Sequence, residues 1–211
     1  MTKSLGLIAL LLALASTGTV RAAPVVLSLQ PTGATSLNAG DTASYQLLID
    51  NPGAVLGAFS LDVSFDPDVL RFIAVPPSGA QFGASLGDPT LGEALGTADE
   101  SSPGVLHLDE VSLLDTATLE ALQGGGTLSS LLLATVTFEG IGPGLGGLGF
   151  LAGSVQLSDA SGNSLAAPLL APIDPLRVVP EPASVALALL ALAGCGVATR
   201  SARRAGASRP A

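Results

Sequence analysis

Apolar and polar residues alternate with a period of two in four short stretches of the middle of the chain. This alternation predicts β-strands with one buried face over residues 45–50, 59–65, 106–109 and 131–138. In the last of these stretches Ala134, Val136 and Phe138 share a face, and Leu133 belongs to the other one. Turn signals rich in Gly, Pro, Asn and Asp separate the strands. The pattern predicts an all-β, two-sheet sandwich of eight or nine short strands.

One short helix is predicted to interrupt the strands. Asp115 or Thr116 is placed to cap its start, and Leu119 and Leu122 give it an apolar side. The run Gly124–Gly126 should end it, because glycine readily adopts the left-handed conformation found after helices.

The first 22 residues have the three parts of a secretory signal peptide. Lys3 supplies the positive start, residues 5–15 form the apolar stretch, and Val20 to Ala22 carry the small-residue cleavage signal. We expect cleavage after Ala22. The alternative, after Ala23, would place Arg21 at the third position back, where a small residue is preferred.

The other end of the chain has the sequence of a short membrane anchor. An apolar stretch over 183–199 follows Val179-Pro180-Glu181-Pro182, and the basic tail 200–211 contains Arg200, Arg203 and Arg204. The stretch is at the lower limit of the ~17–25 residues of a spanning helix. Its arginines are expected to stay in the cytoplasm, which places the prolines just outside the membrane. We therefore predict a single, marginal transmembrane helix.

This tail resembles a PEP-CTERM sorting signal, in which a Pro-Glu-Pro motif precedes a short apolar helix and a terminal arginine cluster. The resemblance implies processing by exosortase, a membrane cysteine protease-transpeptidase of Gram-negative bacteria that make exopolysaccharide. It also implies that Val179, Pro180, Glu181 and Pro182 form the recognition motif, and that an inner-membrane intermediate precedes the cell surface or extracellular matrix. The single cysteine, Cys195, is either a lipidation site or a small residue of the helix.

Charge is unevenly distributed along the chain. Residues 23–180 contain sixteen acidic residues but only Arg71 and Arg177 as basic ones, a net charge of −14. Such a domain repels phosphate backbones, so nucleic-acid binding is not expected. Three acidic pairs could supply oxygen ligands to a structural Ca²⁺, although solvated carboxylates are the simpler interpretation. These pairs are Asp66/Asp68, Asp99/Glu100 and Asp109/Glu110. No other metal or cofactor site is predicted.

Two strings imitate catalytic motifs. Residues 83–87 fit the nucleophile elbow with Ser85 at its centre, but no helix follows. Residues 144–149 fit the dinucleotide fingerprint, again without a helix, and should instead be a tight connection between strands. The only histidine, His107, lies on the polar face of a strand, where a solvated side chain is expected. We predict no catalytic residues.

The middle of the chain is similar to cohesin domains in three segments. Residues 57–72 resemble an early cohesin strand that ends in an Asp-Pro turn, and residues 126–140 and 155–163 resemble the last strands and hairpin. The resemblance covers residues 25–177 and implies a nine-stranded jelly-roll sandwich, related in fold to carbohydrate-binding modules. The dockerin-binding role of cellulosomal cohesins does not carry over, because the chain has no scaffold repeats and no cellulase.

Together these observations divide the chain into a signal peptide (1–22), a cohesin-like domain (23–177) and a sorting tail (178–211). We predict an exported, non-enzymatic surface or matrix protein whose sandwich mediates adhesion or protein contact. The alternative is a carbohydrate- or exopolysaccharide-binding module. That alternative lacks an aromatic stacking platform, since only Phe82 and Phe150 have no obvious buried place.

Overall fold

The computed structural model describes residues 24–75 and 79–180. The predicted signal peptide, Cys195 and the predicted transmembrane helix lie outside these residues. The elements in chain order are β1 (Val26–Pro31), β2 (Ser36–Asn38), β3 (Thr42–Asp50), β4 (Leu56–Ser64), β5 (Leu70–Phe72), β6 (Gln81–Phe82), η1 (Pro89–Leu91), β7 (Ala94–Ser102), β8 (Val105–Ser112), α2 (Thr116–Leu122), η2 (Gly124–Gly126), β9 (Ser130–Gly140), β10 (Gly144–Leu145), β11 (Gly149–Phe150), β12 (Gln156–Asp159), β13 (Leu169–Leu170) and β14 (Arg177–Val179).

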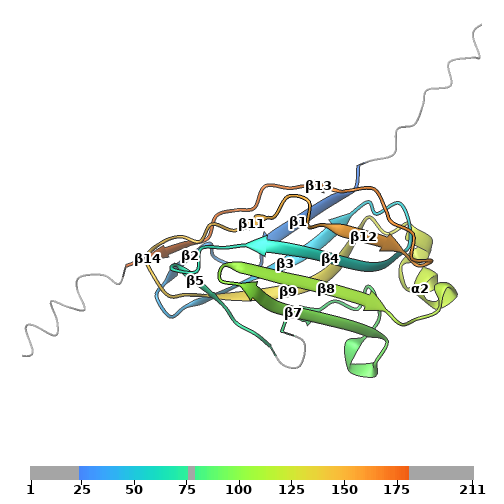
Figure 1. Ribbon diagram of the computed structural model, residues 1–211, viewed down its shortest axis with the longest axis horizontal. Coiled ribbons are helices and arrows are strands. Elements are labelled where there is room, and N and C mark those ends of the chain that lie inside the picture. The colour runs from blue at the N-terminus through green and yellow to red at the C-terminus, as the bar shows by residue number, and fades with distance from the viewer. Residues whose placement is uncertain (1–23, 76–78, 181–211) are drawn as a thin grey trace, which may run out of the picture.

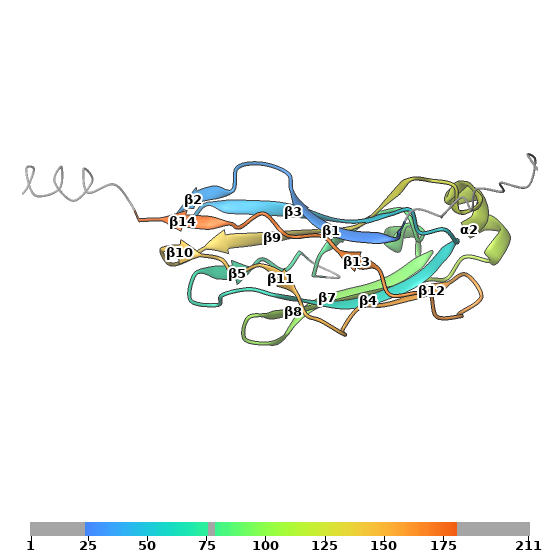
Figure 2. The ribbon, with the colours of Figure 1, turned by 90° about the horizontal axis from the view of Figure 1, so that it is seen from above.

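Two larger sheets face each other and enclose the core (Figure 2). One has the strand order β13-β1-β3-β9-β5, with β6 also pairing with β9. The other has the order β11-β4-β8-β7, with β12 also pairing with β4. A third, small sheet of β10, β14 and β2 lies at the end opposite α2 (Figures 1 and 2). The predicted all-β sandwich with one short α-helix is therefore confirmed for the described residues.

The strands form where the alternation predicted them, because each must bury one face between the two sheets. On β3 the side chains of Tyr45, Leu47 and Ile49 are fully buried. Phe138 of β9 is the centre of an aromatic cluster, with ring centroids 6.4 Å from Tyr45 and 5.3 Å from Phe65. Burial also raises the pKa of the Tyr45 hydroxyl to about 12, with a further contribution from the negative charge of Asp174.

A β-bulge in β9 alters the predicted alternation. The register with β3 shifts between Leu47, which pairs with Ala134, and Leu48, which pairs with Leu132. Leu133 is the extra residue, and both Leu133 and Ala134 are fully buried. The expectation that Leu133 belongs to the opposite face was wrong, because the bulge turns two successive side chains toward the core.

The structure has more strand segments than the eight or nine predicted. Of its fourteen labelled strands, four contain only two residues. The longer strands β7 and β8 are joined by a tight hairpin, which turns at Gly104 with a φ of +77°. A side chain there would also meet the backbone oxygen of Phe65 at 2.6 Å, so the turn requires glycine.

Helix α2 closes one end of the sandwich. Asp115 is its N-cap and accepts a hydrogen bond from the Thr118 backbone N–H at 3.0 Å. Of the two leucines on the predicted apolar side, Leu119 is buried but Leu122 is 43% exposed. Among the described residues no helix is long and apolar enough to cross a membrane.

Directly after α2, the side chain of Gln123 hydrogen-bonds to the backbone of two other segments. Its Nε2 donates to the carbonyl oxygens of Leu56 and Ser85 at 2.7 and 2.9 Å. Its Oε1 accepts from the Leu56 N–H at 2.7 Å. Since Gln123 is only 1% exposed, its bonds satisfy both backbone groups of the fully buried Leu56 and tie them to the partly buried Ser85.

Candidate functional site

The sheet that contains β4, β8 and β7 presents a polar surface on the side away from the core. We call this surface the outer face; it consists of Ala58, Ser60, Asp62, Ser64, Leu95, Thr97, Asp99, Val105, His107, Asp109 and Val111. The strand registers arrange these residues in rows. One row contains Asp62, His107 and Asp99, and the next contains Ser60, Asp109 and Thr97.

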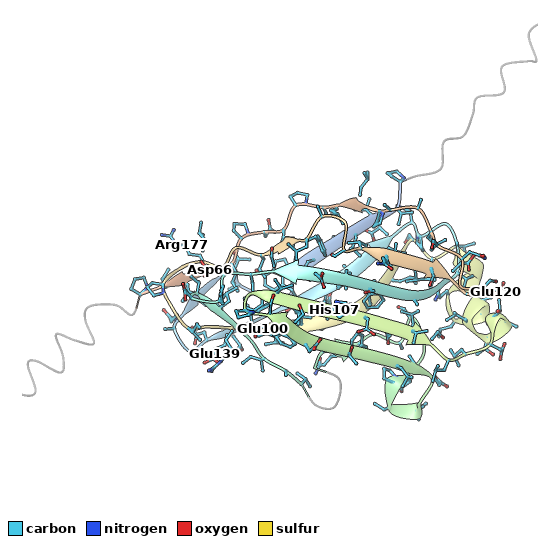
Figure 3. The ribbon with its side chains drawn as sticks, in the orientation of Figure 1. Asp66, Glu100, His107, Glu120, Glu139 and Arg177 are labelled. Atoms are coloured by element: carbon cyan, nitrogen blue, oxygen red, sulfur yellow. The ribbon has the colours of Figure 1, made fainter. Side chains whose placement is uncertain are left out.

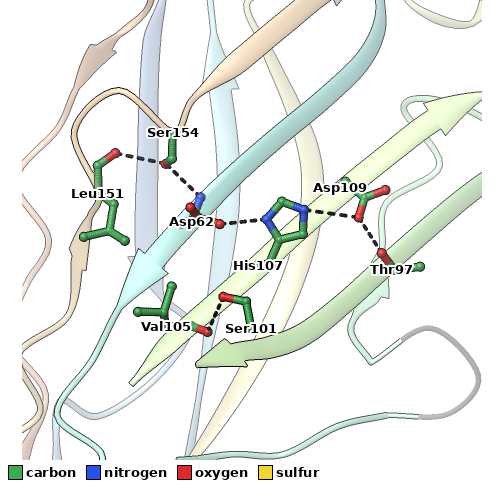
Figure 4. A network of polar contacts seen from close by, with 8 residues as sticks. All are labelled: Asp62, Thr97, Ser101, Val105, His107, Asp109, Leu151 and Ser154. Carbon is green, nitrogen blue, oxygen red and sulfur yellow. Dashed lines mark hydrogen bonds and ion pairs between the residues drawn. The ribbon is translucent and has the colours of Figure 1, made fainter. Parts of the chain in front are cut away.

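His107 is the centre of a hydrogen-bonded network on the outer face (Figure 4). Its Nδ1 lies 2.7 Å from Asp62 Oδ1, and its Nε2 lies 3.6 Å from Asp109 Oδ1. The Thr97 hydroxyl donates to the same oxygen of Asp109. Ser154 fixes the backbone of this row, because its Oγ accepts from the Asp62 N–H at 2.9 Å. The imidazole is therefore held between Asp62 on β4 and Asp109 on its own strand, β8, and Thr97 extends the network to β7.

This network does not contain an activated nucleophile. A catalytic serine or threonine needs its hydroxyl bonded to the base, yet the Thr97 hydroxyl donates to Asp109 and the Ser154 hydroxyl donates to the Leu151 carbonyl. The predicted solvent-facing position of His107 is confirmed, since 36% of its side chain is exposed. Its strand neighbour Asp62 was not predicted as a partner.

One end of the outer face is apolar. Leu95 and Val111 are directly opposite each other in the register of β7 and β8, and they are 59% and 42% exposed. Leu91 and Leu113, close by in the chain, are also exposed. Exposed apolar side chains next to carboxylates and a histidine form a mixed surface of the kind found at protein–protein interfaces.

The inner face of the same sheet contains an unexpected acid. Glu110 is 1% exposed, and neither of its carboxyl oxygens has a hydrogen-bond partner in the described structure. Burial raises the pKa of the Glu110 carboxyl to about 8, so the group is mostly protonated at neutral pH. The expectation of a solvated Asp109/Glu110 pair was wrong for Glu110, because alternation along β8 turns it inward with Leu106 and Leu108.

A cavity of about 400 Å³ opens at the edge of the sandwich, between β6, η1 and β7. Its wall includes Phe82, Pro89, Ala94 and Gly96, with Asp88 as its acidic group. The Asp88 carboxylate accepts hydrogen bonds from the N–H and the hydroxyl of Thr90, and these bonds hold its pKa below the ordinary value.

The two catalytic-looking strings have structural roles. The Ser85 hydroxyl donates to the Leu132 carbonyl at 2.8 Å, which ties it to β9. The glycine string 144–149 contains β10 and the first residue of β11, and it passes from the small sheet to the sheet of β4. A side chain at Gly146 would meet Leu70 Cδ1 at 2.4 Å, so this connection depends on a missing side chain.

The acidic pairs do not converge on a cation. Among the described residues no group of three or more His, Cys, Asp or Glu side chains is placed to hold a metal ion. Asp66 instead accepts from the Asp68 N–H at 3.0 Å, and Glu100 accepts from the Gly104 N–H at 3.0 Å. Asp66 lies in the turn between β4 and β5, whereas Glu100 lies on β7 (Figure 3).

The predicted sorting and cleavage residues lie mostly outside the described part of the chain. Val179 is the last residue of β14, and Pro180 is exposed after it. Glu181, Pro182, Arg200, Arg203 and Arg204 lie outside the described residues, as do Ala22 and Ala23 at the signal-peptide cleavage site.

Aromatic rings are absent from the exposed large hydrophobic residues of the described chain. Phe82 and Phe150, for which the sequence suggested no buried place, are both partly buried against the core. The surface of the described residues therefore lacks the ring platform on which a pyranose stacks.

The chain was also compared with known proteins. No family model matches it, and no curated protein matches its sequence. Solved structures do match: a type II cohesin domain from the cellulosome of Acetivibrio cellulolyticus has a TM-score of 0.56 and 15% identity, over 74% of this chain and 95% of that domain. The fold is cohesin-like.

Two further structures agree. CaCohA2 from Clostridium acetobutylicum has a TM-score of 0.53 and 16% identity, over 74% of this chain and 92% of that one. The cohesin module of a Clostridium perfringens family 33 glycoside hydrolase has a TM-score of 0.51 and 13% identity, over 75% of this chain and all of that module. The cohesin-like fold predicted from residues 25–177 is confirmed. At these identities the likeness concerns the fold, and ligands must be argued from the site.

Proposed function

We propose that this chain is an exported, non-enzymatic protein of the cell surface or extracellular matrix whose outer face binds another protein. One observation carries the proposal. The outer face combines an exposed apolar pair, Leu95 and Val111, with carboxylates and a histidine already fixed by hydrogen bonds. A pre-ordered surface loses little side-chain entropy when a partner binds, which favours recognition.

The fold supports protein contact. CaCohA2, which shares this architecture, has been solved in a complex with CaDoc0917 at a TM-score of 0.52 to this chain. The charge of the domain favours a partner other than a second copy, because the sixteen acidic residues of 23–180 face only Arg71 and Arg177 as basic counterparts. Polysaccharide binding is the weaker candidate, since the described surface has no exposed aromatic ring.

We also propose export and sorting through the two chain ends, on the strength of their sequences. The signal peptide would be removed after Ala22, and exosortase would process the Pro-Glu-Pro motif while 183–199 holds the chain in the inner membrane of a Gram-negative bacterium. The position of β14 is suited to an anchor that follows it. It lies at the end of the sandwich opposite α2 (Figure 1), so an anchor that follows Pro180 leaves the outer face accessible.

The contact is tested by rebinding. Purified full-length protein is added to cells of the producing bacterium that lack it, and the bound fraction is measured. Val111→Asp should reduce binding at least tenfold. Leu170→Asp is the matched control, because Leu170 is 40% exposed against 42% for Val111 and lies in the other sheet. Protease treatment of the cells should abolish binding. Binding that survives protease but is lost after polysaccharide removal, or that Val111→Asp leaves intact, contradicts the proposal.

A further inference from the structure

The cavity at the edge of the sandwich is suited to a positively charged ligand. Its residues include the apolar Phe82, Pro89 and Ala94, and the acidic Asp88; none of the residues that line it is basic. The hydrogen bonds from Thr90 keep the Asp88 carboxylate ionised near neutral pH. An aromatic face and a carboxylate in one apolar pocket both attract an organic cation.

A second acidic group lies behind the cavity wall. Glu110 is directly opposite Gly96 in the register of β8 and β7, so both residues face the inside of the sandwich. Gly96 lines the cavity and has no side chain to separate it from Glu110. The ring of Phe82 lies over this glycine instead, within 3.0 Å of the position that a Cβ would take.

The carboxyl of Glu110 has no partner within the described fold. Both oxygens are buried and make no hydrogen bond, although buried polar groups are normally satisfied. Its neighbours across the sheet are Phe59 and Gly96, neither of which can donate from its side chain. The half-buried Phe82 ring lies over Gly96, the residue that lines the cavity and is opposite Glu110 in the sheet.

We propose that the cavity binds a small organic ammonium ion with an apolar body, and that the Phe82 ring turns aside so that the ammonium group reaches Glu110. The apolar body packs against Pro89 and Ala94. The ammonium group satisfies the Glu110 carboxylate, with Asp88 contributing to attraction at the entrance. The site shares Leu95 with the outer face, but binding of a small cation inside the sandwich goes beyond the proposed protein contact.

The protonation of Glu110 makes cation binding at this site depend on pH. Burial raises the pKa of Glu110 to about 8, and no charged group contributes to that shift. None of the residues that face Glu110 is ionisable; these are Phe59 on β4, Gly96 on β7 and Phe82 on β6. The charged groups around the cavity are Asp88 and Glu93, and the Glu93 carboxylate accepts a hydrogen bond from the Asp88 N–H. A cation binds the ionised carboxyl and displaces its proton. Affinity should therefore rise about ninefold from pH 6 to pH 7 and about fivefold from pH 7 to pH 8, where half of the carboxyl is already ionised.

The test uses 2-phenylethylammonium and its uncharged counterpart 2-phenylethanol. Each is titrated into ¹⁵N-labelled full-length protein at pH 6, 7 and 8, and the amide shifts are followed by NMR. The ammonium ion stays charged throughout, because alkylammonium groups titrate near pH ~10. We expect shifts centred on β6 and β7, at least tenfold tighter binding of the ammonium ion than of the alcohol at pH 8, and the pH dependence given above.

Two variants separate this site from the outer face. Glu110→Gln removes the charge with little change of shape, so ammonium binding should fall at least tenfold and lose its pH dependence. Asp109→Asn, one residue away on the opposite side of the sheet, should leave both unchanged. Equal affinity for ammonium and alcohol, a flat pH profile in the wild type, no binding, or shifts confined to the outer face would each overturn the proposal. Rebinding to cells reports on the outer face separately.

Discussion

The buried Glu110 carboxyl should make the stability of the domain fall as the pH rises. In the unfolded chain this carboxyl ionises with a pKa of 4.5, whereas in the folded protein its pKa is about 8. Between these values the folded state holds a proton that the unfolded state has lost. The free energy of unfolding is therefore highest at the acid end of this window, and it decreases by about 1.4 kcal/mol per pH unit. From pH 5.5 to 7.5 the loss is about 3 kcal/mol.

The measurement is urea unfolding of the full-length protein, followed by circular dichroism at pH 5.5, 6.5 and 7.5. The quantity of interest is the difference in slope between the wild type and Glu110→Gln, because other titrating groups cancel in that difference. In Glu110→Gln the unfolding free energy should fall with pH less steeply than in the wild type, by about 1.4 kcal/mol per pH unit. For a domain of this size, a change of about 3 kcal/mol corresponds to roughly 6–12 °C in Tm.

Glu120→Gln is the matched control, since Glu120 is exposed on α2 (Figure 3). It should keep the slope of the wild type. If Glu110→Gln also keeps that slope, Glu110 is not buried as a protonated acid, and the reasoning about the inner face of β8 fails with it.

Three other changes test the fold and the tail. Gln123→Ala should cost about 2–4 kcal/mol of unfolding free energy, because it leaves the buried Leu56 N–H and carbonyl, and the partly buried Ser85 carbonyl, without these hydrogen bonds. The exposed Gln30→Ala should cost well under that, and equal losses would contradict the bonding described. Phe138→Ala should cost about 3–5 kcal/mol in urea unfolding, and Phe150→Ala, which removes a half-buried ring, clearly less. Glu181→Gln should leave a membrane-held precursor with its C-terminus through Ala211, detected by mass spectrometry; an exported wild-type form that retains this C-terminus would contradict exosortase processing.

The sequence predicts the sheets well because each strand buries one face. The alternation that identified the strands also contains the signal for Glu110, since Leu106 and Leu108 place it on the buried side. A glutamate side chain usually faces water, and the prediction of a solvated carboxylate relied on this residue type rather than on the position of Glu110 in the alternation. Where residue type and alternation disagree, an acidic residue on the buried face of a strand with no local partner is a candidate functional residue.

Other features depend on contacts between distant segments. His107 meets Asp62 only through the register of β8 and β4, which are 45 residues apart at this point. The bulge at Leu133 and the approach of Phe82 to Gly96 likewise depend on how the sheets pair and stack. Leu122 is exposed although Leu119 is buried, because the helix has only seven residues and contacts the sandwich on a narrow side. No local pattern encodes these outcomes.

Protein contact through the outer face is tested most directly by photocrosslinking in intact cells of the producing bacterium. A photoreactive amino acid replaces Val111 on the outer face or, as the control, Leu170 on the other sheet, and the adducts are identified by mass spectrometry. The account predicts a single protein crosslinked from position 111 and absent from position 170. Crosslinks to polysaccharide alone, or the same adducts from both positions, would contradict it.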